Sequence, residues 1–403
     1  MIRSYVALVR NDWRPLAFGI VCAFLSSPGQ TFFISLFIGA AATDLGLGAT
    51  ELGSLYMVGT IGAASLLPLT GHWIDRLDLR LYTLLVMAGL AAACGVMAMA
   101  SGPVGLVAGL LLLRLTGQGL TTHVAVTSIA RYFRHQRGRA LSLVAMGFPL
   151  SQGVLPTAAV MLGATDDWRR SYALIGVAVL LMAAPILLWL IRSLSSFTRP
   201  TDIGSGVPSR VLDGLRIMTR SRFFWFALPL LLYMPFASTA LVFHIQAIAA
   251  AKGWSHELVA LGFAAYALSH ASTLLLIGGL IDRLGATTML PTMIFPMLFG
   301  LAALGLLEAP PVMLLFLGLM GMSSGLAQTT VTAVWAEIYG VGRLGTIRSF
   351  ATMLMVAGTA LGPVAIGALL DSRVSVAAIC GALIAFGLSS ALLARIGVRR
   401  RTR

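Results

Sequence analysis

Twelve long apolar runs dominate the 403-residue sequence and restrict its fold more than any other feature. They cover residues 15–42, 50–73, 81–101, 103–130, 139–163, 171–194, 223–251, 256–281, 286–307, 311–336, 345–370 and 374–396. A run of about 20 apolar residues has the length that crosses a bilayer as a helix. Because lipid leaves only helices and closed barrels with satisfied backbone groups, the pattern predicts an all-α membrane protein with twelve transmembrane helices.

Composition agrees with this class. Only 10% of the residues are charged, against about 25% in a soluble globular protein. The first run is too long for the apolar region of a cleavable signal peptide, which has roughly 7–15 residues. The three cysteines lie inside apolar runs, which indicates small buried side chains and not a metal or redox site.

The positions of the cations predict the orientation. With a cytoplasmic N-terminus, the inner segments hold 23 of the 28 Lys and Arg residues and the outer loops hold four. Cytoplasmic loops are the ones enriched in these residues, so we expect both termini in the cytoplasm, in the inner (plasma) membrane of a bacterium. The net charge of +14 then follows from topology, and no nucleic-acid partner is expected.

The runs divide into two halves. We expect an N-terminal six-helix bundle over 1–194, a cytoplasmic linker over 195–222 and a C-terminal six-helix bundle over 223–403. Within the linker Val211, Leu212, Leu215 and Met218 share one helical face, which predicts a short amphipathic helix on the inner membrane surface.

The halves repeat each other at a constant offset of 207 residues. Six identities fall at helix breakers and loop charges: Pro28/Pro235, Gly71/Gly278, Asp75/Asp282, Arg76/Arg283, Gly138/Gly345 and Pro156/Pro363. Six helices repeated in the same orientation predict two bundles related by a pseudo-twofold axis along the membrane normal.

Four local motifs carry a resemblance to a known family. The segment 71–80 (GHWIDRLDLR) is similar to the loop G-x-x-x-D-R-x-G-R-R/K, and 279–283 (GLIDR) repeats part of it. The segment 114–119 (RLTGQG) is similar to R-x-x-x-Q-G, and 358–367 (GTALGPVAIG) to a Gly-Pro bend motif. Together with the repeat, they resemble the major facilitator superfamily over the whole chain.

The resemblance implies a transporter with no cofactor, and it implies gating by the loop residues Gly71, Asp75, Arg76, Asp282 and Arg283. Asp75 and Asp282 are expected near helix N-termini of the opposite half, where a carboxylate is worth about 0.3–1 kcal/mol. The positive-inside effect alone is the alternative explanation of these charges. A weaker resemblance, in Phe224-Trp225, His244 and 345–348 (GTIR), points to the monocarboxylate and oxalate/formate porters.

Arg114 is the strongest candidate for substrate binding. It lies near the middle of its run, where an Arg costs about 2.5–3.5 kcal/mol, so such residues usually face a cavity and are functional. Gln118 follows at i+4 on the same helical face. A structural cation that binds backbone carbonyls of helix 1 or 5 is the alternative role.

The resemblance implies that helices 1, 4, 7 and 10, with parts of 2, 5, 8 and 11, line the cavity. The polar and aromatic residues on these helices complete the predicted binding set: Gln30, Gln152, Tyr233, His244, Tyr266, His270, Gln328 and Trp335. For each of them alone, packing or hydrogen bonding between helices is an equal explanation.

No carboxylate is expected at mid-depth, so the cavity should be neutral to positive. That disfavours a cationic substrate and favours a small anion or a neutral solute. The first hypothesis is a secondary active transporter for a small organic anion such as a monocarboxylate, by symport or exchange, with protons or a counter-anion as coupling partner. The alternative is a proton-coupled drug or amphiphile exporter. A transporter-like sensor or a membrane enzyme would need a soluble domain or a catalytic cluster, and the sequence shows no Walker, zinc or Ser/His/Asp pattern. A monomer is the default expectation.

Overall fold

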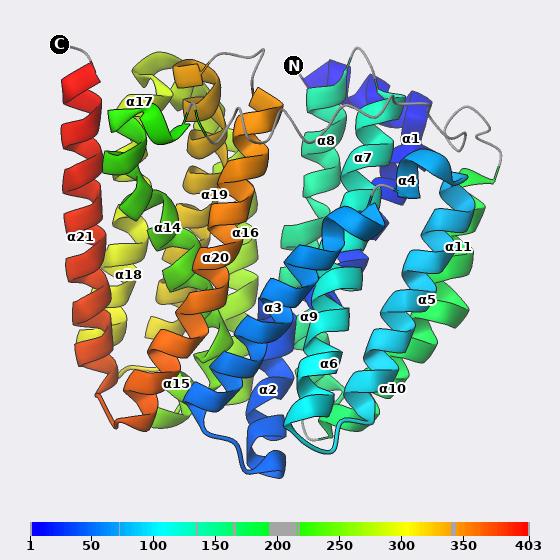
Figure 1. The fold of residues 1–403 in the computed structure, drawn as a ribbon, viewed down its shortest axis with the longest axis horizontal. Helices are drawn as coiled ribbons and strands as arrows, with labels where there is room; N and C mark the ends of the chain where they lie inside the picture. The colour runs from blue at the N-terminus through cyan, green and yellow to red at the C-terminus, as the bar shows by residue number, and fades with distance from the viewer. Residues whose placement is uncertain are drawn as a thin grey trace. The chain divides into compact units, whose positions relative to one another are not determined.

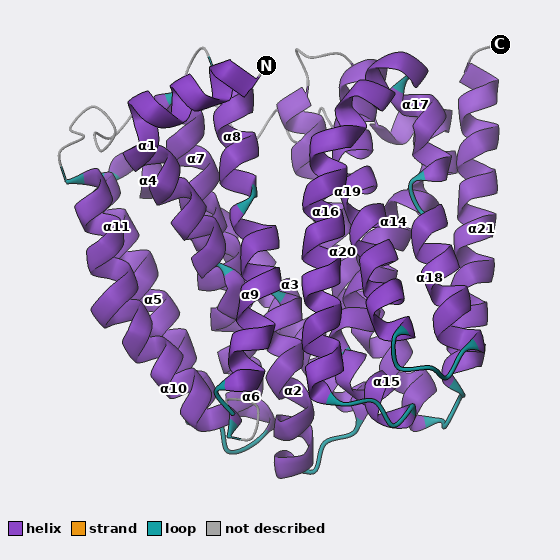
Figure 2. Cartoon of the chain, turned by 180° about the vertical axis from the view of Figure 1, so that it is seen from behind, coloured by secondary structure: helices purple, strands orange, loops and turns teal. Residues whose placement is uncertain are grey.

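The computed structural model describes residues 2–71, 73–133, 136–163, 167–192, 216, 218–339 and 344–401. Most of the predicted linker, including its amphipathic helix, lies outside these residues. The chain divides into two compact units, the first formed by 1–47 and 58–204 and the second by 48–57 and 205–403. Each unit is a bundle of helices running side by side (Figures 1 and 2).

The first unit contains six spans, the second of which it shares with the other unit. Its elements are α1 (Ile2–Leu25), η1 (Ser27–Gly29), α2 (Thr31–Leu45), α3 (Ala49–Gly71), α4 (Trp73–Arg76), α5 (Leu79–Ala98), α6 (Pro103–Leu113), η2 (Arg114–Thr121), α7 (Thr122–Tyr132), α8 (Arg137–Ala145), α9 (Gly147–Met161), α10 (Trp168–Ala178), η3 (Val179–Ala183) and α11 (Ala184–Ile191). The segments η2 and η3 are π-helical, whereas η1 is a 3₁₀ turn.

Most spans of the second unit are long continuous helices. The elements of this unit are α14 (Arg222–Phe243), α15 (Ile245–Ala251), α16 (His256–Leu284), α17 (Ala286–Met289), η4 (Leu290–Thr292), α18 (Phe295–Leu306), α19 (Val312–Tyr339), α20 (Leu344–Asp371) and α21 (Val376–Arg401). The ninth span is divided into α17, η4 and α18.

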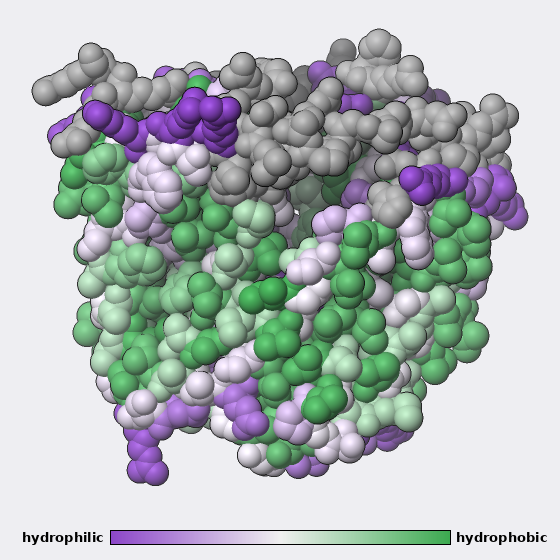
Figure 3. Space-filling view, viewed as in Figure 1, coloured by the Kyte–Doolittle hydropathy of each residue, from purple (hydrophilic) through white to green (hydrophobic). Residues whose placement is uncertain are grey.

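The described residues contain twelve helical stretches long and apolar enough to cross a membrane, which confirms the predicted number and class. On the face seen in Figure 3, apolar side chains cover the middle of the helices in each unit, and polar ones gather near their ends. Leu268, Leu275 and Leu276 on α16 are 73–78% exposed, which suits contact with lipid and not with water. The protein is therefore an integral membrane protein.

The packing within each unit repeats as the sequence offset predicts. The first span (α1) packs against the fifth (α8 and α9), and the seventh (α14) packs in the same way against the eleventh (α20). The third (α5) packs against the sixth (α10), as the ninth (α18) does against the twelfth (α21).

The second unit also holds the first turns of α3. Asp371, the last residue of α20, accepts hydrogen bonds from the backbone N–H groups of Ala49 (3.0 Å) and Thr50 (2.7 Å). A carboxylate in this place satisfies two N–H groups that a helix leaves unpaired at its start. Two glycines let the backbones approach, because a Cβ on Gly53 or Gly367 would stand 2.6 or 2.5 Å from a carbonyl oxygen of Pro363 or Ala49.

Asp371→Ala should destabilise the second unit by about 0.5–2 kcal/mol, the usual cost of removing a helix N-cap. Thermal unfolding in lipid nanodiscs measures the effect. Ser372→Ala, which changes the exposed neighbouring residue, is the control and should leave the melting temperature unchanged. Equal melting temperatures for Asp371→Ala and the wild-type protein would show that this carboxylate does not hold α3.

Candidate functional site

The first span is broken in its middle. α1 ends at Leu25, η1 makes a single turn at Ser27–Gly29, and α2 begins at Thr31 after an extended Gln30. Pro28, the second residue of the turn, has no N–H to donate to a helix. Hydrogen bonds connect the two sides of the break. Gln30 Nε2 donates to Ser26 Oγ (3.3 Å), and Ser26 Oγ donates to the carbonyl oxygen of Ala23 (2.7 Å).

The π-helical segment η2 of the fourth span lies against this break. Gly29 touches it so closely that a Cβ would stand 2.1 Å from the carbonyl oxygen of Leu113 and 2.5 Å from the backbone nitrogen of Gln118. From the other side, a Cβ on Gly117 would stand 2.7 Å from the nitrogen of Gly29. Two glycines therefore bring together two irregular backbone segments, and π-bulges of this kind are frequent at functional sites.

Arg114 is the first residue of η2 and is buried. Its Nη1 donates to the carbonyl oxygen of Gly29 at 3.3 Å. Every other charged residue of the twelve described spans lies within seven residues of a span end, whereas Arg114 is the twelfth residue of Pro103–Tyr132. Arg114 is therefore the one charged residue at mid-depth in the part of the chain that the structure describes, and no carboxylate lies at that depth there.

Three further predicted residues of the first unit lie around this region. The half-buried Gln118 places its backbone nitrogen against Gly29, and Gln30 follows the break directly. Gln152 is half-buried on α9, which packs against α1, α2 and η1. The first unit thus offers a buried cation with amide side chains on neighbouring segments.

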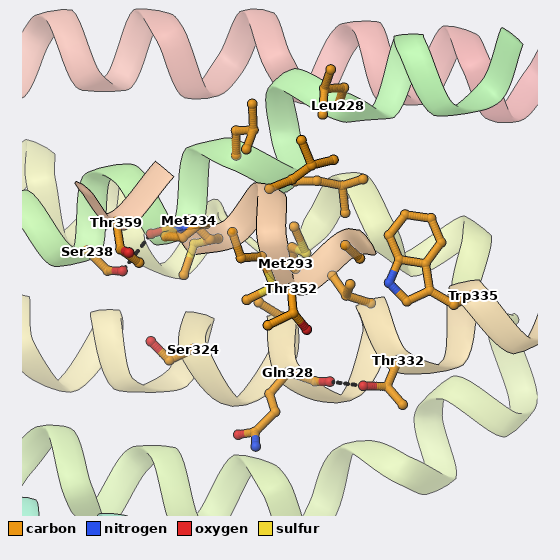
Figure 4. A pocket seen from close by; sticks show the side chains of 18 of the residues that line it. Leu228, Met234, Ser238, Met293, Ser324, Gln328, Thr332, Trp335, Thr352 and Thr359 are labelled. Carbon is orange, nitrogen blue, oxygen red and sulfur yellow. Dashed lines mark hydrogen bonds between the residues drawn. The ribbon is translucent and has the colours of Figure 1, made fainter. Parts of the chain in front are cut away.

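The second unit contains a pocket of about 460 Å³ between α14, α19 and α20, with Met293 after η4 closing one side. Figure 4 shows its side chains, with Trp335 at one end and Ser238 and Thr359 at the other. Two predicted residues, Gln328 and Trp335, belong to the lining.

Tyr266 and His270 stand behind this pocket on α16. His270 is buried, and its Nε2 lies 3.2 Å from Gln328 Oε1, so an N–H at this nitrogen donates to the amide. The rings of Tyr266 and His270 meet edge to face at 5.6 Å. In Figure 4 Gln328 points its amide away from Thr352 and Met293, toward α16.

Tyr233 and His244 are not part of the lining. Tyr233 packs edge to face against Phe386 of α21 (5.5 Å) and beside Gly387, where a Cβ would stand 2.9 Å from the tyrosine ring. His244 Nε2 donates to the carbonyl oxygen of Pro363 (2.8 Å). These contacts join α14 to α21 and α20, so the structure gives both residues a packing role beside the predicted one.

Sequence reasoning missed most of the pocket. The lining includes Met234, Ser238, Met293, Thr352 and Thr359, none of which was among the predicted residues. One signal was present, because Thr352 and Thr359 are seven residues apart and therefore share one face of an otherwise apolar helix.

The predicted gating residues are only partly described. Gly71 is buried at the end of α3, while Arg76 and Arg283 are exposed in the last turns of α4 and α16. The side chains of Asp75 and Asp282 lie outside the described part, so their gating role stays a prediction.

Comparison with known proteins gives a consistent result. A family model described as "Major Facilitator Superfamily" matches residues 17–363 and 236–403. No curated protein matches the chain. Two solved structures of a bacterial homolog to the human lysosomal transporter Spinster are similar in fold, one inward-facing and unoccupied, the other inward-facing and occupied. The first has a TM-score of 0.67 at 15% identity and covers 96% of this chain and 95% of its own. The second has a TM-score of 0.65 at 16% identity, with 98% and 95% covered.

Proposed function

Because the chain belongs to the Major Facilitator Superfamily, we propose that it is a secondary active transporter for a small organic anion, such as a monocarboxylate. Membership supports secondary transport of a small molecule across a membrane and indicates a transporter, not an enzyme. The proposal adds the substrate class, alternating access, a bacterial inner membrane with both termini in the cytoplasm, and a monomeric state.

Arg114 is the observation that carries the substrate class. Its positive charge is buried at mid-span, and the described spans place no carboxylate near the same depth. The N-terminus of α2 begins two residues after Gly29 and adds the partial positive charge of a helix start. A carboxylate that enters this region meets a planar guanidinium, which binds such groups in a bidentate manner.

The second candidate function is a proton-coupled exporter of drugs or amphiphiles. The apolar pocket of the second unit favours it, since Met234, Met293 and Trp335 would suit a large apolar solute. The lack of a mid-span carboxylate in the described spans counts against a cationic substrate.

Uptake by proteoliposomes tests the two functions side by side. Radiolabelled carboxylates are offered under an imposed proton gradient or against internal carboxylate, and a lipophilic cationic dye is offered under the reversed gradient. The organic-anion proposal expects carboxylate uptake above that of empty liposomes and no dye movement. Dye transport without carboxylate uptake would replace it with the exporter function.

A pH profile tests the role of His270 in coupling. Imidazole in water exchanges its proton near pH 6.5, so a histidine that takes part in proton coupling should make transport depend on pH between about 5.5 and about 8. His270→Gln should flatten this profile more than His244→Gln, because His270 contacts Gln328 of the pocket while His244 bonds Pro363. An unaltered profile in the double variant would leave the substrate's own acid group, or exchange with a counter-anion, as the coupling element.

A further inference from the structure

The side chains that line the pocket of the second unit suit an uncharged group of a ligand. Among its described lining residues none is acidic or basic. Leucine, valine and proline side chains form much of the surface, together with Met234, Met293 and Met355. Methionine is flexible and polarisable, so it adapts to apolar ligands of varied shape.

The hydroxyl groups of the pocket strengthen this conclusion. Four of the six lining hydroxyls donate their only proton to a carbonyl oxygen of their own helix, namely Ser238 to Met234, Ser324 to Met320, Thr332 to Gln328 and Thr359 to Val356. A hydroxyl that has donated presents only lone pairs. A carboxylate would face these lone pairs and lose its hydration, which disfavours an anion in this pocket. The other donors of the lining are all neutral: the indole N–H of Trp335 at one end, the amide of Gln328 and the hydroxyls of Thr239 and Thr352.

The pocket is also long. Its lining follows α19 from Ser324 to Trp335, and the eleven steps between them at 1.5 Å per residue extend over about 16.5 Å. Its volume of about 460 Å³ is within the range of roughly 300–1,000 Å³ found for small-molecule sites. Acetate or lactate would fill little of this space.

We infer that the transported solute is an organic anion with an extended apolar chain, and that the pocket between α14, α19 and α20 binds that chain. The inference rests on the proposed function, which makes the transported solute an organic anion. It narrows the substrate class from small polar monocarboxylates to amphipathic ones.

Protection of a single cysteine in the pocket tests the inference. Thr352→Cys, at an exposed lining position, is combined with alanine at Cys22, Cys94 and Cys380, which are buried. The variant is reconstituted in nanodiscs, since detergent chains would compete for the pocket, and is labelled with a maleimide in the presence of acetate, butyrate, hexanoate or octanoate. Each added methylene should lower the half-protecting concentration about fourfold, the equivalent of about 0.8 kcal/mol.

Filling the pocket should remove this dependence. Ala327→Leu takes up space in the lining, whereas Ala385→Leu adds the same atoms on the exposed face of α21 and is the matched control. Octanoate should lose most of its advantage over butyrate, on the order of 250-fold for four methylenes, in Ala327→Leu alone. Val331→Phe fills the same pocket and serves as the second variant, should Ala327→Leu fold poorly. Equal half-protecting concentrations for all four acids would overturn the inference. So would a chain-length dependence in Ala327→Leu and Val331→Phe that is as steep as in the unfilled protein.

Uptake of the same acids separates this inference from the proposed function. Uptake that increases from acetate to octanoate and is lost in Ala327→Leu supports both. Equal uptake of all four acids keeps the proposed function and overturns the long apolar chain. No uptake of any acid, together with chain-length-dependent protection, would refute organic-anion transport and leave the pocket as an apolar binding site.

Discussion

Arg114→Ala should abolish uptake of the carboxylate substrate in proteoliposomes while leaving the protein folded in the membrane. The substitution removes the charge at mid-depth that the proposed function assigns to the anion. Removing one partner of a buried, hydrogen-bonded charge pair costs about 2–5 kcal/mol, which corresponds to a loss of affinity of about 30-fold to about 5,000-fold. Initial uptake rates, normalised to the amount of reconstituted protein, measure the effect.

Arg114→Lys separates charge from geometry. Lysine retains the positive charge but lacks the planar fork that binds a carboxylate through two parallel hydrogen bonds, so it should restore little transport. Arg139→Ala, which removes an exposed cation in the first turn of α8, controls for a change in net charge. Normal uptake by Arg114→Ala would limit Arg114 to holding the carbonyl of Gly29 in the broken first span.

The twelve spans were predictable because a bilayer sets one length for all of them. The break at η1 was not. Proline occurs inside membrane helices because neighbouring groups can satisfy the freed carbonyl, and Pro156, Pro235 and Pro363 all lie within continuous helices. Pro28 differs from them in being followed by Gly29, which meets η2 backbone to backbone. That contact joins segments about 85 residues apart and cannot be recognised from a local pattern.

The prediction for the fourth span assumed regular α-helical spacing. Arg114 was correctly placed near the middle, since depth depends only on counting residues from the span ends. The direction in which the residues after Arg114 point depends on the type of helix. Here η2 is π-helical, and Thr121 Oγ1 donates to the carbonyl oxygen of Thr116 five residues earlier. Residues after η2 therefore point in directions that a 3.6-residue period does not give.

In the second unit, the pocket is lined by helices that the sequence analysis expected to line the cavity, but by other faces of some of these helices. Gln328 and Trp335 of α19 line the pocket, and His270 contacts Gln328. On α14, Tyr233 and His244 belong to the predicted binding set, and they contact α21 and α20. Ser238 faces the pocket instead. All sides of a membrane helix are apolar enough to be buried, so hydropathy cannot decide which side packs against which neighbour.

Gly29→Ala should lower uptake by about tenfold or more and reduce the stability of the first unit by about 1–3 kcal/mol, the usual cost of overpacking a close contact. The new methyl group would stand 2.1 Å from the carbonyl oxygen of Leu113 and 2.5 Å from the nitrogen of Gln118. Both are backbone atoms, so no side chain can move aside. Either η1 or η2 must shift, and the hydrogen bond from Arg114 to the Gly29 carbonyl would be lost with that shift.

Two further variants make this last prediction specific. Gly117→Ala pushes on the same contact from the fourth span, because its methyl group would stand 2.7 Å from the nitrogen of Gly29, and it should reproduce both effects. Gly95→Ala on α5 is the control, since nothing lies within 4 Å of a Cβ there and alanine favours a helix. Thermal unfolding in nanodiscs and initial uptake rates are measured for all three. If Gly29→Ala matched Gly95→Ala in both, the close approach of η1 and η2 would not be needed to position Arg114.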